Sequence, residues 1–294
     1  MINSPHIQAF FDEATFTVTY LVGDPATQQA AVIDPVLDFD PASGTVSTAS
    51  AESVLAAANA KGWTITRVLE THAHADHLSA APLIKARTGA RIGIGSQIGD
   101  VQRVFAGIFN APDVSGTGAE FDDLFADGQT FWIGKLEVEV LHTPGHTPAC
   151  ISYRIGDAVF VGDTLFMPDY GTARADFPGG DAAALYRSIR RILSLPAETR
   201  LFMCHDYKAP GRAHYAWEST VAEERARNVH IHDGVEEADF IRMRQDRDKG
   251  LAAPRLLLPS VQVNIRAGHF PPAEGNAVHY LKLPLQLPEG ADWA

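Results

Sequence analysis

Residues 71–79 read Thr71-His72-Ala73-His74-Ala75-Asp76-His77-Leu78-Ser79 and carry a His-x-His-x-Asp-His cluster. The cluster places three imidazoles and one carboxylate within six positions. First-row transition metals are bound in proteins by imidazole nitrogen and carboxylate oxygen, so this stretch predicts a metal site. Neither packing nor secondary structure calls for three histidines in so short a run.

The cluster lies between two predicted elements. Ile65 to Leu69 is rich in β-branched residues and predicts a strand that leads straight into the cluster. Leu78 to Thr88 predicts a helix that stops at Gly89. The cluster is therefore expected on a loop at the carboxyl end of a strand, where binding groups collect in layered folds.

Three further strand-like runs end at loops that carry histidine or aspartate. The runs and the residues that follow them are Leu136–Leu141 before His146, Ala158–Val161 before Asp163, and Leu201–Met203 before His205. Four such loops predict that four strand ends meet in space. The candidate ligands are then His72, His74, Asp76, His77, His146, Asp163 and His205. A set with no thiolate argues against a structural zinc site and favours an open catalytic one, with one or two metals.

The remaining chain predicts a mixed α/β (α+β) fold with a tail. The predicted elements are a hairpin of Val18–Val22 and Ala30–Ile33, a helix over Ala51–Lys61, a loop over Asn110–Ala119, a helical segment over Val235–Lys249 and a partly β-like stretch over Pro254–Pro288. We expect a main domain over residues 1–232 and a C-terminal tail over 233–294 that packs on it.

Composition narrows the class of protein. The chain has 294 residues, 46% hydrophobic, which suits one large globular domain with an appendage. Its net charge of −12 argues against nucleic acid and anionic membranes as partners. Two cysteines form no disulfide framework, and no secretory signal is visible at the N-terminus, so a cytoplasmic location is expected.

From about Phe16 to Asn228 these motifs, in this order, resemble the metallo-β-lactamase superfamily. The resemblance implies an αββα sandwich with the metal at one edge. Within the superfamily the chain is most similar to persulfide dioxygenases, also called sulfur dioxygenases, some of whose bacterial relatives are labelled β-lactamase-like hydrolases. The stretches that carry this likeness, besides the cluster, are Pro144–Cys150, Gly162–Leu165, Arg174-x-Asp176-Phe177, His205-Asp206-Tyr207 and Ser219–Arg225.

The resemblance implies one Fe(II) per chain, held by His72, His146 and Asp163. The implied reaction converts glutathione persulfide, O₂ and water to glutathione and sulfite. His74, Asp76, His77 and His205 then surround the iron ligands, and the predicted catalytic groups are Tyr207, His205, Asp76 and His77. The resemblance also suggests a homodimer.

Arg174, Lys208 and Arg212 are predicted to bind the carboxylates of glutathione, because arginine above all matches carboxylate geometry. The segment Gln97–Asp123, the loop 168–173 and the tail are longer than expected for the compact family members. We expect these additions to border the pocket, which leaves the thiol carrier open.

Two other functions remain open at this stage. All ligands of a two-metal site are present, so a dinuclear Zn²⁺ hydrolase of the glyoxalase II or lactonase type is a direct alternative. A non-catalytic sulfide or redox sensor that responds through Cys204 is a second one, from a different class.

Overall fold

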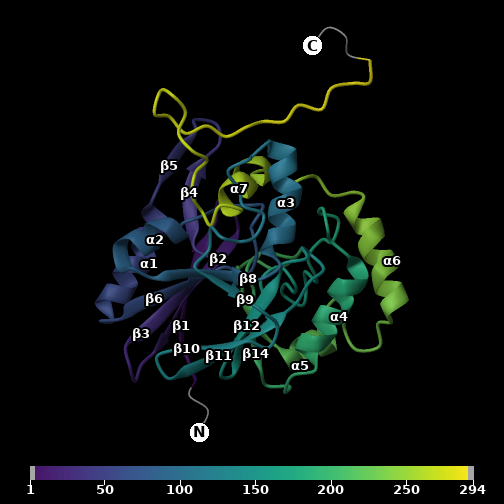
Figure 1. Cartoon of the computed structure of the whole chain (residues 1–294). Coiled ribbons are helices and arrows are strands. Elements are labelled where there is room, and N and C mark those ends of the chain that lie inside the picture. The colour runs from purple at the N-terminus through teal and green to yellow at the C-terminus, as the bar shows by residue number, and fades with distance from the viewer. Residues whose placement is uncertain (1–3, 291–294) are drawn as a thin grey trace.

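The computed structural model describes residues 4–290, in which two six-stranded sheets pack face to face between outer helices (Figure 1). The first sheet has the order β1-β2-β3-β6-β8-β9: His6–Asp12, Thr17–Asp24, Gln29–Ile33, Thr64–Leu69, Arg91–Gly95 and Asp123–Phe125. The second has the order β10-β11-β12-β13-β14-β15: Thr130–Ile133, Leu136–His142, Ile151–Ile155, Ala158–Phe160, Arg200–Phe202 and Glu218–Thr220. A small third sheet joins β5 (Thr45–Ser47), β4 (Val36–Asp40) and β7 (Leu78–Ser79).

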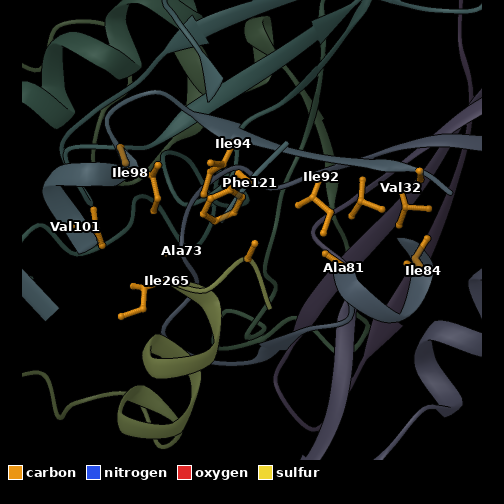
Figure 2. Close-up of a cluster of buried hydrophobic side chains, with 14 of the residues drawn as sticks. Val32, Ala73, Ala81, Ile84, Ile92, Ile94, Ile98, Val101, Phe121 and Ile265 are labelled. Atoms are coloured by element: carbon orange, nitrogen blue, oxygen red, sulfur yellow. The ribbon is translucent and has the colours of Figure 1, made fainter. Parts of the chain in front are cut away.

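Three hydrophobic clusters hold these layers together. One lies between the sheets and includes Tyr20 and Tyr153, one from each sheet. Another joins the first sheet to α1 (Ala49–Ala60), α2 (Ala81–Thr88), α3 (Ile98–Phe109) and α7 (Leu257–Asn264); part of it is drawn in Figure 2. A third joins the second sheet to α4 (Ala182–Leu193), α5 (Val221–Arg227) and α6 (Glu237–Asp248). The predicted αββα sandwich is thus confirmed.

Strand direction brings the ligand-bearing loops together. β3 pairs with β6 in parallel, and β13 pairs with β14 in parallel. β11 and β13 both pair with β12 in antiparallel fashion, so β11 runs in the same direction as β13. The carboxyl ends of these strands therefore share one edge within each sheet.

Most predicted elements are present, and three predictions need correction. The hairpin β2–β3, helix α1 and helix α6 are confirmed, but β1 was missed. The helix predicted from Leu78 begins only at Ala81, because Leu78 and Ser79 pair with β4. The stretch 254–288 was wrongly predicted as β-like, since it contains helix α7. Pro259 falls in the first turn of α7, where a missing N–H breaks no helical hydrogen bond.

The C-terminal segment covers two sides of the body. Helix α6 packs against α4, and α7 packs against β7 and α3. The chain then runs on as an extended arm with exposed leucines at 283, 285 and 287 (Figure 1). Across residues 4–290, no helix combines the length and apolarity that crossing a bilayer would require.

A buried acid on α5 gives a stability prediction. Burial raises the pKa of Glu224 to about 8, above its ordinary 4.5, although Asn228 donates a hydrogen bond of 2.6 Å to it. A raised folded-state pKa contributes stability that is complete below the unfolded pKa and is lost as pH rises through the folded one. Each pKa unit corresponds to about 1.4 kcal/mol.

We therefore expect Glu224→Gln to gain a few kcal/mol in unfolding free energy relative to the wild type between pH 5 and pH 9. Denaturant unfolding at a series of pH values measures this. Glu137→Gln, a change at an exposed residue of β11, is the matched control and should track the wild type. Parallel pH profiles for Glu224→Gln and the wild type would contradict the prediction.

Candidate metal centre

Two imidazoles and one carboxylate form one ligand set at the shared strand edge. Ligand atoms of His72, His146 and Asp163 all lie within 4.8 Å of one another. Oδ2 of Asp163 is 3.9 Å from Nε2 of His72 and 3.6 Å from Nε2 of His146. Nε2 of His72 and Oδ1 of Asp163 are buried without a hydrogen-bond partner among the described residues. Buried polar atoms are normally satisfied, so this set fits a cation.

The other ring nitrogen of each histidine is fixed by a hydrogen bond. His146 donates from Nδ1 to the carbonyl oxygen of Arg174 at 2.8 Å. His72 donates from Nδ1 to the hydroxyl of Thr71 at 3.0 Å, and that hydroxyl donates to Asp34 at 2.9 Å. Each Nε2 is thereby left with its lone pair toward Asp163, which is the tautomer a metal ligand needs. Burial and the neighbouring histidines hold the pKa of His72 well below its usual value, so the ring stays neutral.

A second group of ligands lies beside the first. Nε2 of His205 is 3.3 Å from Asp163 Oδ1 and 3.5 Å from Asp76 Oδ2. Asp76 Oδ2 is also 3.3 Å from Nδ1 of His77, whose Nε2 has no partner within residues 4–290. Asp163 thus stands between two possible metal positions, as a bridging carboxylate would.

His74 faces two carboxylates, although one of its ring nitrogens also lies within 4.8 Å of ligand atoms of Asp76 and His77. Its Nε2 is 3.0 Å from Oδ1 of Asp34 and 3.5 Å from Oε2 of Glu70. Burial lowers the pKa of His74, but the charge of Asp34 and its hydrogen bond raise it well above the usual value. The contact of Nε2 with Asp34 competes with metal binding at that nitrogen.

The sequence analysis missed Asp34 and Glu70, although their position directly after predicted strands could have indicated them. Each is the first residue after a buried parallel strand, β3 or β6. A carboxylate at that position is at the same sheet edge as the histidine loops. Glu70 is satisfied in part by the hydroxyl of Ser79, which donates to it.

A cavity of about 560 Å³ opens over the two ligand groups. His146, Asp163 and Asp76 lie at the metal end, and the walls include the aromatic residues Phe16, Phe166, Tyr170, Phe177 and Tyr207. Tyr207 stacks on His205 with ring centroids 5.6 Å apart. Burial, with the charges of Asp76 and Asp163, holds the pKa of Tyr207 well above its usual range, so its hydroxyl keeps its proton.

The predicted carboxylate-binding residues are placed unequally. Arg174 lines the cavity, but it pairs with Asp176 at 2.6 Å and donates to the carbonyl of Ala252. Lys208 lies 3.9 Å from the centre of the Tyr215 ring. Arg212 forms ion pairs with Asp206 and Asp169. Lys208 and Arg212 do not line the cavity, so their predicted role gains no support from the geometry.

Two of the three additions to the chain border the cavity, as expected. The tail and the loop 168–173 do border the cavity. The segment Gln97–Asp123 does not, because α3 packs on α7 instead. Both cysteines are buried, and burial raises the pKa of each thiol, to about 12 for Cys150. Thiols of this kind are protonated and unreactive, which disfavours a redox sensor acting through Cys204.

The tail also reaches the ligands through a buried ion pair. Arg244 and Asp248 on α6 lie 2.6 Å apart and are almost fully buried. Asp248 accepts from the backbone N–H of Ala175 at 2.9 Å, and Arg244 donates to the carbonyl of Thr172 at 3.1 Å. Residues 172–175, which this ion pair holds, include Arg174, whose carbonyl oxygen accepts the hydrogen bond that orients His146. The tail therefore takes part in shaping the metal centre.

The chain belongs to the metallo-β-lactamase superfamily, whose family model matches residues 13–205. It is a metal-dependent enzyme of that superfamily. A probable metallo-hydrolase of Burkholderia pseudomallei is 54% identical over 290 residues, 95% of this chain and 98% of that protein. Glyoxylase B2 of Dictyostelium discoideum is 45% identical over 288 residues, 97% of this chain and 98% of that protein.

Relatives named for oxidation are more distant. The mitochondrial persulfide dioxygenase ETHE1 of Bos taurus is 30% identical over 266 residues, 89% of this chain and 88% of that protein. The crystal structure of ETHE1 from Myxococcus xanthus is 32% identical, with a TM-score of 0.72 over 90% of this chain and all of that one. The names of the more similar relatives thus favour hydrolysis over oxidation.

The hydrogen bond to His72 leads to a test of the ligand geometry. Thr71→Val keeps the side-chain shape but removes the acceptor for His72 Nδ1. Loss of such an outer partner typically weakens metal binding by about 10- to 100-fold. Competition with a chromophoric chelator measures that affinity for the first metal bound.

Thr66→Val is the matched control, since Thr66 on β6 donates only to the carbonyl of Ala30. It should bind metal as the wild type does. Wild-type metal affinity in a folded Thr71→Val protein would show that this hydrogen bond does not position His72.

Proposed function

We propose that the protein is a mononuclear Fe(II) dioxygenase that oxidises glutathione persulfide to sulfite and glutathione. The observation that carries the proposal is the position of His74. Because Nε2 of His74 faces Asp34 and Glu70, the ligand set that contains His72 is completed by His146 and Asp163 alone, two imidazoles and one carboxylate. A two-His, one-carboxylate set with open positions is the arrangement used by non-haem iron oxygenases.

The side chains of the chain suit this reaction. His72, His146 and Asp163 would hold the iron, which when bound supplies the redox chemistry that lets dioxygen react with a sulfane sulfur. The aromatic walls keep bulk water from the reacting sulfur and present an apolar surface to it. Tyr207 keeps its proton and offers a hydroxyl donor to a substrate in the cavity. The overall change is glutathione persulfide plus O₂ plus water to glutathione plus sulfite.

A second candidate is a dinuclear zinc hydrolase that acts on a glutathione thioester or a lactone. Two observations favour it: the names of the more similar relatives, and the group of Asp76, His77 and His205 beside Asp163. In that case Asp163 would bridge two metals, and a metal-activated water would be the nucleophile. Both candidates use the same cavity and differ in metal count.

Elemental analysis combined with two activity assays separates the candidates. Protein purified after growth with iron should hold about one Fe per chain and consume O₂ when glutathione persulfide is added. Two zinc ions per chain, no O₂ uptake and rapid turnover of S-lactoylglutathione would replace the proposal by the hydrolase.

Substitutions in the two ligand groups test the metal count. His72→Ala should lose iron and O₂ uptake together, because it removes one of three iron ligands. His77→Ala should keep close to one iron per chain in the dioxygenase, but lose one of two metals in the hydrolase. Metal content per chain after desalting is the measurement.

His142→Ala is the matched control for these variants, since that half-buried imidazole bonds only to the carbonyl of Pro148. It should retain the metal content of the wild type. A His77→Ala protein that loses half of the bound metal would refute the one-iron centre.

A further inference from the structure

Four arginines line the cavity, in a protein whose net charge is −12: Arg174, Arg244, Arg247 and Arg255. The only carboxylates in the lining are Asp76 and Asp163, which both lie in the metal centre. Cation-rich walls in an otherwise acidic protein favour an anionic ligand. The volume of the cavity, about 560 Å³, lies within the range of roughly 300–1,000 Å³ that small-molecule sites occupy.

Two of the four arginines are neutralised by acids of the chain. Arg174 forms its pair with Asp176, and Arg244 forms its buried pair with Asp248. Arg247 and Arg255 are different: both are exposed, and neither makes a side-chain hydrogen bond or ion pair within residues 4–290. The charge of Arg255 contributes to lowering the pKa of Asp40. Asp40 is not among the residues that line the cavity.

The two unpaired arginines come from one short stretch of the tail. Arg247 lies in the last turn of α6, and Arg255 lies just before α7. The residues between them, including Leu251 and Ala252, also line the cavity. Helix α6 is fixed in place by its packing on α4 and by the Arg244–Asp248 pair, so the stretch is held against the cavity.

We propose that Arg247 and Arg255 form a carboxylate-binding subsite in the wall of the cavity. It takes a small, flexible thiol carrier with two carboxylates, of which glutathione is the simplest example. The carrier's sulfur reaches the metal centre while its carboxylates pair with the two guanidinium groups. The C-terminal segment, and not Lys208 or Arg212, then selects the carrier. This inference rests on the proposed function for the identity of the reacting sulfur only.

Equilibrium binding tests the subsite without any turnover. Calorimetric titration of the metal-loaded protein with glutathione and with glutathione diethyl ester compares two ligands that share the thiol but differ in carboxylate charge. The wild type should bind glutathione about tenfold or more tightly than the diester, given the strength of charge-assisted pairs.

Arg247→Gln and Arg255→Gln should each weaken glutathione binding by about three- to tenfold and leave the diester unchanged. Arg242→Gln, on an exposed part of α6 and paired with Asp239, is the matched control and should behave as the wild type. Unchanged glutathione affinity in both variants, equal affinity of wild type for the two ligands, or no glutathione binding would each overturn the subsite. If O₂ uptake fails but these binding differences appear, the dioxygenase proposal falls and the subsite stands.

Discussion

The buried carboxylate of Asp34 is the constraint on which the metal centre depends. One of its oxygens accepts from the backbone N–H of Thr71 at 2.7 Å and lies 3.0 Å from His74; the other accepts from the Thr71 hydroxyl. Burial raises the pKa of this acid, but His74 and the hydrogen bonds lower it overall, so it stays ionised. Removing one member of a buried ion pair typically costs about 3–5 kcal/mol, so this arrangement resists change.

Asp34 acts on the centre in two opposite ways. Through Thr71 it orients His72 toward Asp163, which builds the three-ligand set. Through its contact with His74 it competes with a metal for a second imidazole of the same motif. A superfamily motif that supplies ligands for two metals is therefore compatible with a centre that uses one.

The C-terminal segment also affects the geometry of the metal centre and the charge of the cavity. Its helix α6 contributes the pair Arg244–Asp248, which holds the backbone that orients His146. The same segment lines one side of the cavity with Arg247 and Arg255, which form no ion pair within residues 4–290. Metal geometry and the charge of the cavity are thus both linked to residues far from the ligand motifs in sequence.

The sequence by itself determined the superfamily, the layered fold and the seven candidate ligands. The candidate ligands follow from a local pattern, apolar strands that end in His or Asp, repeated four times. The superfamily and its layered fold follow from the resemblance of the motifs to that family. It could not place Asp34 and Glu70 beside His74. Nor could it show that Arg212 pairs with Asp206, whereas Arg247 and Arg255 form no ion pair in the described part of the chain. Those facts arise from side chains that are distant in sequence and meet only when parallel strand ends and the tail pack together. Tertiary packing decides them because electrostatic partners act over a few ångströms of space, whatever their separation along the chain.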